Sequence, residues 1–122
     1  MIEASGLGRT GRTEMTDETW RTEHVNQLLD AFLRLEDRDD AAAFLRDLCT
    51  LGELRDMSQR WAVVRLLEAG LHYGDISRRT GASTATITRI ASWLHHGEGG
   101  YRRMLDRLRA AGELPYPAGV ER

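Results

Sequence analysis

The sequence contains no lysine, and all 17 basic residues among its 122 positions are arginine. We attribute this absence first to codon or genome bias and only second to function. The single cysteine, Cys49, excludes an intramolecular disulfide and fits a protein of the reducing cytoplasm. No apolar run approaches the roughly 18 residues of a membrane-spanning helix, so no membrane partner is expected.

The patterns of catalytic and metal sites are also missing. The sequence has no glycine-rich phosphate loop after a strand and no nucleophile elbow, so we do not expect an enzyme or any catalytic residue. His95 and His96 are adjacent on a predicted helix, where neighbouring side chains point about 100° apart and chelate poorly. With no CxxC or HxxxH pattern, we predict no metal site and no cofactor.

The net charge of the sequence is small, and the charged residues are unevenly distributed. The net charge of −2 argues against a broadly basic coat that binds nucleic acid without specificity. Residues 17–56 hold five arginines and eleven carboxylates, a net −6, whereas residues 57–122 hold ten arginines and six carboxylates, a net +4. Such asymmetry is typical of a small nucleic-acid-binding regulator, although charge runs are more often solvated helix faces.

Apolar residues recur with the spacing of helices, and no stretch alternates as a strand does. We therefore predict an all-α domain over residues 16–111, between a disordered leader over 1–15 and a tail over 112–122. The helices are expected over 17–35, from about 41 onward, over 50–69, as a pair within 73–96, and over 101–110. The predicted N-caps are Thr16 or Asp17, Asp39 or Asp40, and Thr50, which has capping-box spacing to Glu53.

Residues 73–96 have the pattern of a helix-turn-helix. The first helix carries an apolar Ile76 and then a small residue, Ser77, where the two helices approach closely. Gly81 suits a turn that needs positive φ, and the small Ala82 can point inward after it. The second helix has Ser83 or Thr84 as N-cap and an apolar stripe at helical spacing: Ile87, Ile90, Ala91 and Leu94.

The opposite face of this second helix is small, polar and free of acidic side chains. Threonine offers a hydroxyl and a methyl group to base edges, and arginine can bind guanine or phosphate. We predict DNA contacts from both helices of the pair, namely Arg78, Arg79, Thr84, Ala85, Thr86, Thr88, Arg89 and Ser92. From spacing alone, a helical hairpin with a glycine turn and no DNA function is an equally good interpretation.

Several motifs resemble one family. The run GASTATITR (81–89) resembles the recognition region of the Trp repressor superfamily. Together with DLCTLGEL (47–54), MSQRW (57–61) and LHHGEGGYRRMLDRL (94–108), it is similar to the YerC/YecD group of Trp-repressor-like proteins. The resemblance implies a six-helix Trp-repressor-like fold in which two chains interlock as a homodimer with two helix-turn-helix heads.

The resemblance also identifies a possible small-molecule pocket. Trp repressors bind tryptophan between two arginines, which Arg60 and Arg89 match here. The next residue is glycine in the Trp repressor but Ile90 in this chain, and a serine near the ligand is replaced by Trp93. Both changes shrink the pocket, and overpacking costs about 1–3 kcal/mol. We therefore predict that tryptophan is not the ligand.

These observations predict a cytoplasmic, sequence-specific DNA-binding regulator, a repressor, whose partners are double-stranded DNA and a second copy of the chain. The alternative is a dimeric helical interaction module without specific DNA binding. Such a module needs exposed apolar anchors, and Trp93 is the one candidate. Because Trp93 lies at the edge of the apolar stripe, we expect it to be partly buried.

Overall fold

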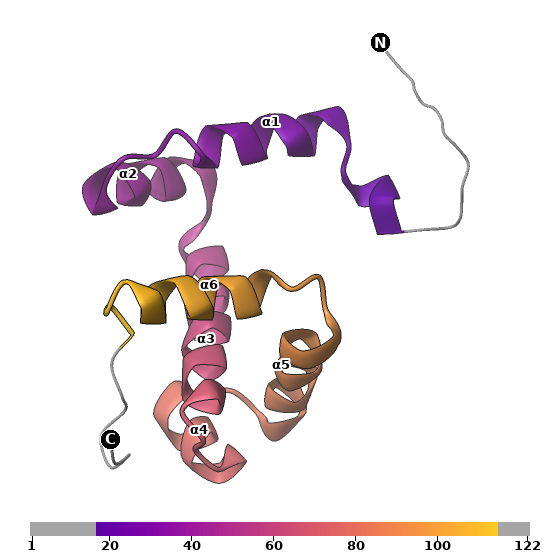
Figure 1. The fold of residues 1–122 in the computed structure, drawn as a ribbon, viewed down its shortest axis with the longest axis vertical. Coiled ribbons are helices and arrows are strands. Elements are labelled where there is room, and N and C mark those ends of the chain that lie inside the picture. Colours follow the sequence, from indigo (N-terminus) through magenta and orange to yellow (C-terminus); the bar gives the residue numbers. More distant parts are fainter. Residues whose placement is uncertain (1–16, 115–122) are drawn as a thin grey trace. The chain divides into compact units, whose positions relative to one another are not determined.

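The structure, a computed structural model, describes residues 17–114 (Figure 1). This part contains six α-helices and one short 3₁₀-helix and no strand, which confirms the predicted all-α fold. None of its helices is long and apolar enough to cross a bilayer. The predicted leader over 1–15 lies outside the described residues. The chain divides into two units, residues 1–48 and 49–122, which are described separately below.

The first helix is shorter than predicted. A 3₁₀-helix spans Asp17–Trp20, and the α-helix α1 spans only Glu23–Phe32. Thr22 is the N-cap, because its hydroxyl accepts a hydrogen bond from the Val25 N–H at 3.2 Å. The predicted single helix over 17–35 with its cap at Thr16 or Asp17 is therefore wrong.

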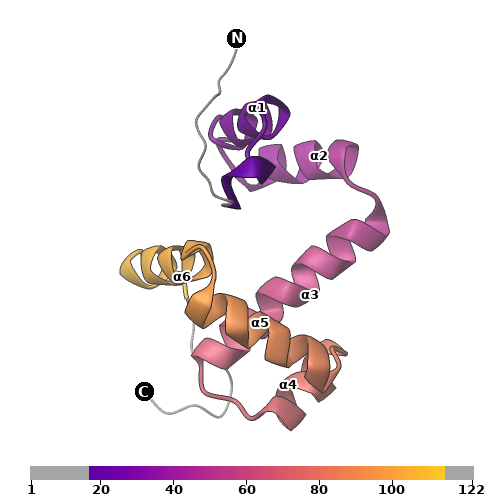
Figure 2. The ribbon, with the colours of Figure 1, turned by 90° about the vertical axis from the view of Figure 1, so that its right-hand side faces the viewer.

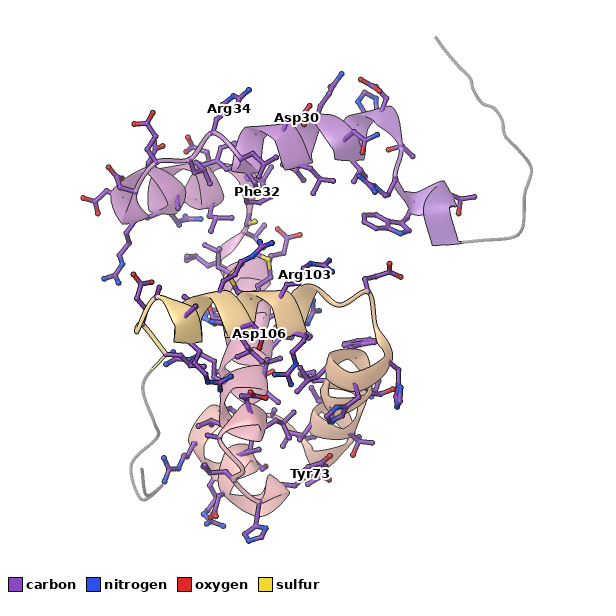
Figure 3. All side chains as sticks on the ribbon, in the orientation of Figure 1. Asp30, Phe32, Arg34, Tyr73, Arg103 and Asp106 are labelled. Atoms are coloured by element: carbon purple, nitrogen blue, oxygen red, sulfur yellow. The ribbon has the colours of Figure 1, made fainter. Side chains whose placement is uncertain are left out.

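The second helix begins earlier than predicted. Helix α2 spans Arg38–Leu48, and the Asp37 carboxylate accepts a hydrogen bond from the Asp40 N–H at 2.8 Å. Asp39 and Asp40 therefore lie in the first turn of α2 and are not the cap. Acidic side chains in this turn stabilise the helix through its positive N-terminal dipole. The Phe32 ring, labelled in Figure 3, packs edge-on against Phe44 with centroids 5.6 Å apart.

Helix α3, Leu51–Glu68, starts with the predicted capping box. The Thr50 hydroxyl accepts from the Glu53 N–H at 3.1 Å, and the Glu53 carboxylate accepts from the Thr50 N–H at 2.8 Å. After α3 the chain turns through Gly70, which has a φ of 88°. The start and end of this long helix therefore follow directly from local sequence.

The remaining helices are α4 (Tyr73–Thr80), α5 (Thr84–His96) and α6 (Gly100–Ala110). Helix α3 packs against α4 and α5, α4 packs against α5, and α6 packs against α5. Figures 1 and 2 both show α4 beside the end of α3 that leads into it. This arrangement puts the predicted helix pair on the scaffold of α3.

The core of the second unit lies between these helices. Its buried residues come from each of α3 to α6 and the turn: Val63, Val64, Ile76, Ala82, Ile87, Ile90, Leu94 and Leu105. On α3 the adjacent residues Val63 and Val64 are both fully buried, because this helix has neighbours on more than one side, whereas Met57 near its start is exposed.

Candidate nucleic-acid interface

The turn between α4 and α5 has the geometry that the sequence predicted. Gly81 adopts φ 79° and ψ 0°, a left-handed conformation that other residues rarely adopt. Ala82 follows with 3% of its surface exposed, and Ile76 of α4 is fully buried. Ser77, expected where the helices approach closely, is half-buried. The turn therefore holds α4 and α5 against each other through small side chains.

Helix α5 begins at a side-chain cap. The Ser83 hydroxyl accepts a hydrogen bond from the Thr86 N–H at 3.1 Å, so Ser83 rather than Thr84 is the N-cap. One face of the helix is buried over its whole length, through the residues predicted for it: Ile87, Ile90, Ala91 and Leu94. This burial fixes which side of α5 can face a partner.

The other face of α5 is exposed and carries no carboxylate. Most of the predicted DNA contacts on this helix are exposed: Thr84, Ala85, Thr88, Arg89 and Ser92. Thr86 is half-buried instead, at the edge of the face. These five side chains are small or flexible, so a double helix could approach the backbone at this part of α5 closely.

Hydrogen bonds within α5 determine which donor and acceptor groups of these side chains remain available to a partner. The Thr88 hydroxyl donates to the Thr84 carbonyl at 2.9 Å, so its oxygen remains an acceptor and its methyl group remains free. The Thr86 hydroxyl accepts from Arg89 Nη2 at 3.2 Å and from Ser83 Oγ at 3.1 Å. The guanidinium of Arg89 is therefore directed toward the start of α5.

The two arginines in the last turn of α4 differ in their surroundings. Both are exposed, but Arg78 forms an ion pair with Asp75 one turn earlier in the same helix. Arg79 makes no hydrogen bond or ion pair with any residue between 17 and 114. Because Arg78 must share its charge with a carboxylate, Arg79 is the stronger candidate for a phosphate contact.

The residues of the predicted small-molecule pocket have different environments. Arg60 and Arg89 are exposed, whereas Ile90 is fully buried in the core with Val63 and Val64. Trp93, expected to be partly buried, keeps 50% of its surface exposed. Within the described part of the chain, no group of three or more His, Cys, Asp or Glu side chains could hold a metal ion.

An ion-pair cluster that the sequence did not reveal fastens α6 to the end of α3. Nη1 and Nη2 of Arg102 donate to the Glu68 carboxylate, at 3.0 and 2.9 Å, and Arg109 Nη2 donates to it at 3.0 Å. The hydrogen bond from Arg102 is the main cause that lowers the pKa of Glu68, with Arg109 adding to it and burial opposing it. Asp106, labelled in Figure 3, lies 3.6 Å from Arg102 at the exposed side.

A second interaction outside the prediction involves Gln59 of α3, whose side chain donates to the carbonyl of Thr80 at the end of α4. Its partner is 21 residues away in sequence. Neither interaction has a local sequence signal, since polar residues on a helix are ordinarily solvated. Helical periodicity could have indicated only that Gln59 borders the apolar side of α3.

The comparison with known families decides where this helix pair belongs. A family model described as Trp repressor protein matches residues 23–109, most of the chain. The chain belongs to the Trp repressor family. It is 39% identical over 89 residues to the uncharacterized protein YerC of Bacillus subtilis (strain 168), across 73% of this chain and 86% of YerC.

Solved structures of Trp repressor relatives have the same fold. A TrpR-like protein from Eubacterium eligens is 42% identical with a TM-score of 0.73, over 76% of this chain and 96% of that protein. A candidate Trp repressor from Staphylococcus aureus is 36% identical with a TM-score of 0.74, over 85% of this chain and all of that protein, at 100%. The predicted YerC and Trp-repressor-like identity is therefore confirmed.

Membership of the Trp repressor family bears on two further predictions. Proteins of this family are DNA-binding regulators and not enzymes, which confirms that this chain is not an enzyme. The family normally binds tryptophan as its corepressor. The differences from Trp repressor at Ile90 and Trp93 therefore concern whether this member of the family binds tryptophan.

Proposed function

We propose that this Trp repressor family protein is a sequence-specific DNA-binding repressor of transcription that acts as a homodimer in the cytoplasm. The observation that carries the proposal is the two-sided character of α5. One face is buried along its whole length. The other is exposed and has no carboxylate, and over residues 84–92 it carries small side chains, most of them polar, with one arginine. These properties suit a helix that enters a major groove.

The chemistry of the exposed face supports reading of bases as well as phosphates. With its proton donated to the Thr84 carbonyl, the Thr88 hydroxyl can accept from the amino group of adenine or cytosine, and its methyl group can contact thymine. Arg79 is exposed and unpaired among the described residues, so it is well suited to a phosphate. Arg89 also extends toward the start of α5, where phosphates favour the helix N-terminus.

Exposed apolar side chains support a dimer. In the second unit, the large ones that remain exposed include Leu51, Met57 and Met104. A second copy of the chain would remove such residues from water and would present two α5 helices. In helix-turn-helix dimers, among them Trp repressor itself, the two recognition helices contact two DNA half-sites whose centres lie about 34–36 Å apart.

We also propose that tryptophan is not the corepressor of this protein. The Ile90 side chain is fully buried between α3 and α5, so a ring placed against that part of α5 must displace it. Titration calorimetry with L-tryptophan up to millimolar concentration should give no heat of binding, and tryptophan should not change the affinity for DNA. Micromolar binding by the wild-type protein would contradict the steric argument.

The direct experiment uses DNA alone. Purified protein is mixed with duplexes of random sequence, and the bound fraction is amplified through several rounds. The wild-type protein should enrich one pseudo-palindromic sequence and bind it about 10³-fold or more tighter than a scrambled duplex of the same composition. Binding of every duplex with equal affinity, or of none, would contradict the proposal.

Salt dependence separates phosphate contacts from base contacts. Each neutralised phosphate contributes about −0.9 to the slope of log affinity against log salt concentration. Arg79→Ala should therefore flatten the slope by about 0.9 per protomer, and it should weaken selected and scrambled duplexes alike. Arg107→Ala, an exposed arginine of α6, is the control and should leave the slope unchanged.

The second candidate function is a dimeric interaction module without specific DNA binding. The half-exposed Trp93 on α5 favours it, because tryptophan is a common anchor at protein interfaces. A protein that enriches no duplex, and whose Trp93→Ala variant loses a protein partner while remaining a dimer, would establish this function instead.

A further inference from the structure

Gln59 is the residue of α3 that reaches the turn between α4 and α5. Its Nε2 donates a hydrogen bond of 3.1 Å to the carbonyl of Thr80, the last residue of α4. Carbonyl groups in the last turn of a helix have no partner within the helix. The Gln59 amide therefore supplies the partner that the helix itself cannot provide.

The turn on the other side of this bond is internally bonded. The Thr80 hydroxyl donates to the Ile76 carbonyl at 2.8 Å and accepts from the Ala82 N–H at 3.1 Å. The Gly81 N–H donates to the Ser77 carbonyl at 2.8 Å. These bonds connect residues 80–82 with one another. A displacement of the Thr80 carbonyl would therefore also displace the residues that lead into α5.

The contact with Gln59 has no substitute among the residues that the structure describes. Between positions 17 and 114, no other hydrogen bond joins a side chain of α3 to α4, to α5 or to their turn. Gln59 is half-buried, and its Nε2 lies 3.9 Å from the position that a Cβ on Gly81 would occupy. A side chain at position 81 would therefore lie in ordinary van der Waals contact with this amide.

We propose that Gln59 is a positioning residue for DNA recognition. Its hydrogen bond fastens the turn to α3 and so fixes the direction in which α5 leaves α4. Apolar packing holds the helices together but is non-directional, whereas a hydrogen bond defines one register of the turn. The inference rests on the proposed function, since it assigns Gln59 a role in the specificity of α5 for a base sequence.

The first arm of the test needs no DNA. Gln59→Met keeps the length of the side chain and removes the donor, and Gln59→Glu keeps the planar head as a carboxylate without an N–H. Ser58→Ala, at an exposed neighbouring position on α3, is the matched control. In both Gln59 variants the Ala82 amide should exchange its hydrogen about 3- to 10-fold faster, the size expected for one neutral hydrogen bond. Amides inside α3 should be unaffected.

The second arm measures affinity for the duplex selected from the random pool and for its scrambled counterpart. Gln59→Met should weaken binding of the selected duplex about 3- to 10-fold and leave the scrambled duplex unchanged, because phosphate contacts tolerate a small change in the direction of α5. Equal weakening of both duplexes would overturn the inference, since the ratio of the two affinities would then not depend on the Gln59 hydrogen bond.

The outcomes separate this inference from the proposed function. A wild-type protein that selects a duplex, with Gln59 variants that match Ser58→Ala in both arms, would overturn the role of Gln59 alone. A wild-type protein that selects no duplex would overturn the proposed function and with it any role of Gln59 in reading DNA, whatever the exchange rates show.

Discussion

The two units of the chain differ in what they bury. Helices α3 to α6 share a core of fully buried apolar side chains, whereas α1 and α2 contain no buried residue. Yet α1 has an apolar stripe at helical spacing, formed by Val25, Leu28, Leu29 and Phe32. A helix of 10 residues with such a stripe is marginal alone in water. The difference supports the proposed homodimer, in which a second copy of the chain would cover the apolar side of the N-terminal helices.

The largest expected effect is in the core of the second unit. Ile90→Gly removes a fully buried side chain, which should lower the free energy of unfolding by about 2–5 kcal/mol, and adds about 1 kcal/mol for glycine within a helix. Chemical denaturation of both proteins measures this loss. If Ile90 occupies the space that holds the tryptophan ring in Trp repressors, the variant should also gain weak binding of indole. A loss below 1 kcal/mol would mean that Ile90 does not belong to the core.

The corresponding test in the first unit is Phe32→Ala. In the single chain, Phe32 is 37% exposed and packs edge-on against Phe44, and such an aromatic pair contributes about 0.5–1.5 kcal/mol. If a second copy covers it, as we propose, the loss should approach the roughly 3–5 kcal/mol of a buried phenylalanine. We expect the larger value.

Protein concentration distinguishes these two outcomes. The stability of an obligate dimer rises with concentration, so the midpoint of wild-type unfolding should shift on dilution. Light scattering should give about twice the mass of 13.8 kDa. A folded monomer that persists on dilution, with a small effect of Phe32→Ala, would show that the contrast between the two units has another cause.

Many features of the second unit could be predicted because their signals are local. A glycine at the turn and the i, i+3, i+4, i+7 stripe of α5 were sufficient to place Gly81 and Ile87. The predicted start of the first helix was wrong. Thr16, Asp17 and Thr22 can all act as helix N-caps, and the local sequence does not show which of them the helix uses. The partners of Gln59 and Glu68 could not be predicted, since they lie 21 residues away for Gln59 and 34 and 41 residues away for Glu68.

The ion-pair cluster that fastens α6 to α3 predicts a pH-dependent effect. Glu68→Gln removes the charge that Arg102 and Arg109 share, at a side chain only 16% exposed, and should lower stability by about 1–3 kcal/mol at neutral pH. The folded-state pKa of Glu68 is lowered, so its stabilisation is present above its ordinary pKa and is lost as pH falls through the folded value.

Denaturation at several pH values tests this sign. The difference in stability between wild type and Glu68→Gln should shrink as the pH falls below about 4. Asp106→Asn, at the exposed edge of the same cluster, is the control and should change stability by at most about 1 kcal/mol. A difference that grows on acidification would show that the charged form of Glu68 is not the stabilising one.

The smallest effects concern two threonine caps, one in each unit. Thr50→Ala removes the hydroxyl that accepts from the Glu53 N–H, and Thr22→Ala removes the hydroxyl that accepts from the Val25 N–H, so each should lower stability by about 0.5–2 kcal/mol. Both should shift the same unfolding transition if dimer formation makes the two units cooperative. If Thr22→Ala leaves the main transition unchanged, the N-terminal helices unfold independently.

The central claim is that the exposed face of α5 reads a DNA sequence, and Thr88 tests it most directly. The affinities of wild type and Thr88→Ala should be measured for the duplex selected from a random pool and for its scrambled counterpart, with Thr88→Ser and Thr88→Val to separate methyl from hydroxyl. We predict that Thr88→Ala loses about 1–3 kcal/mol for the selected duplex and nothing for the scrambled one. An unchanged ratio of the two affinities would contradict the account and would place the reading surface elsewhere on the molecule.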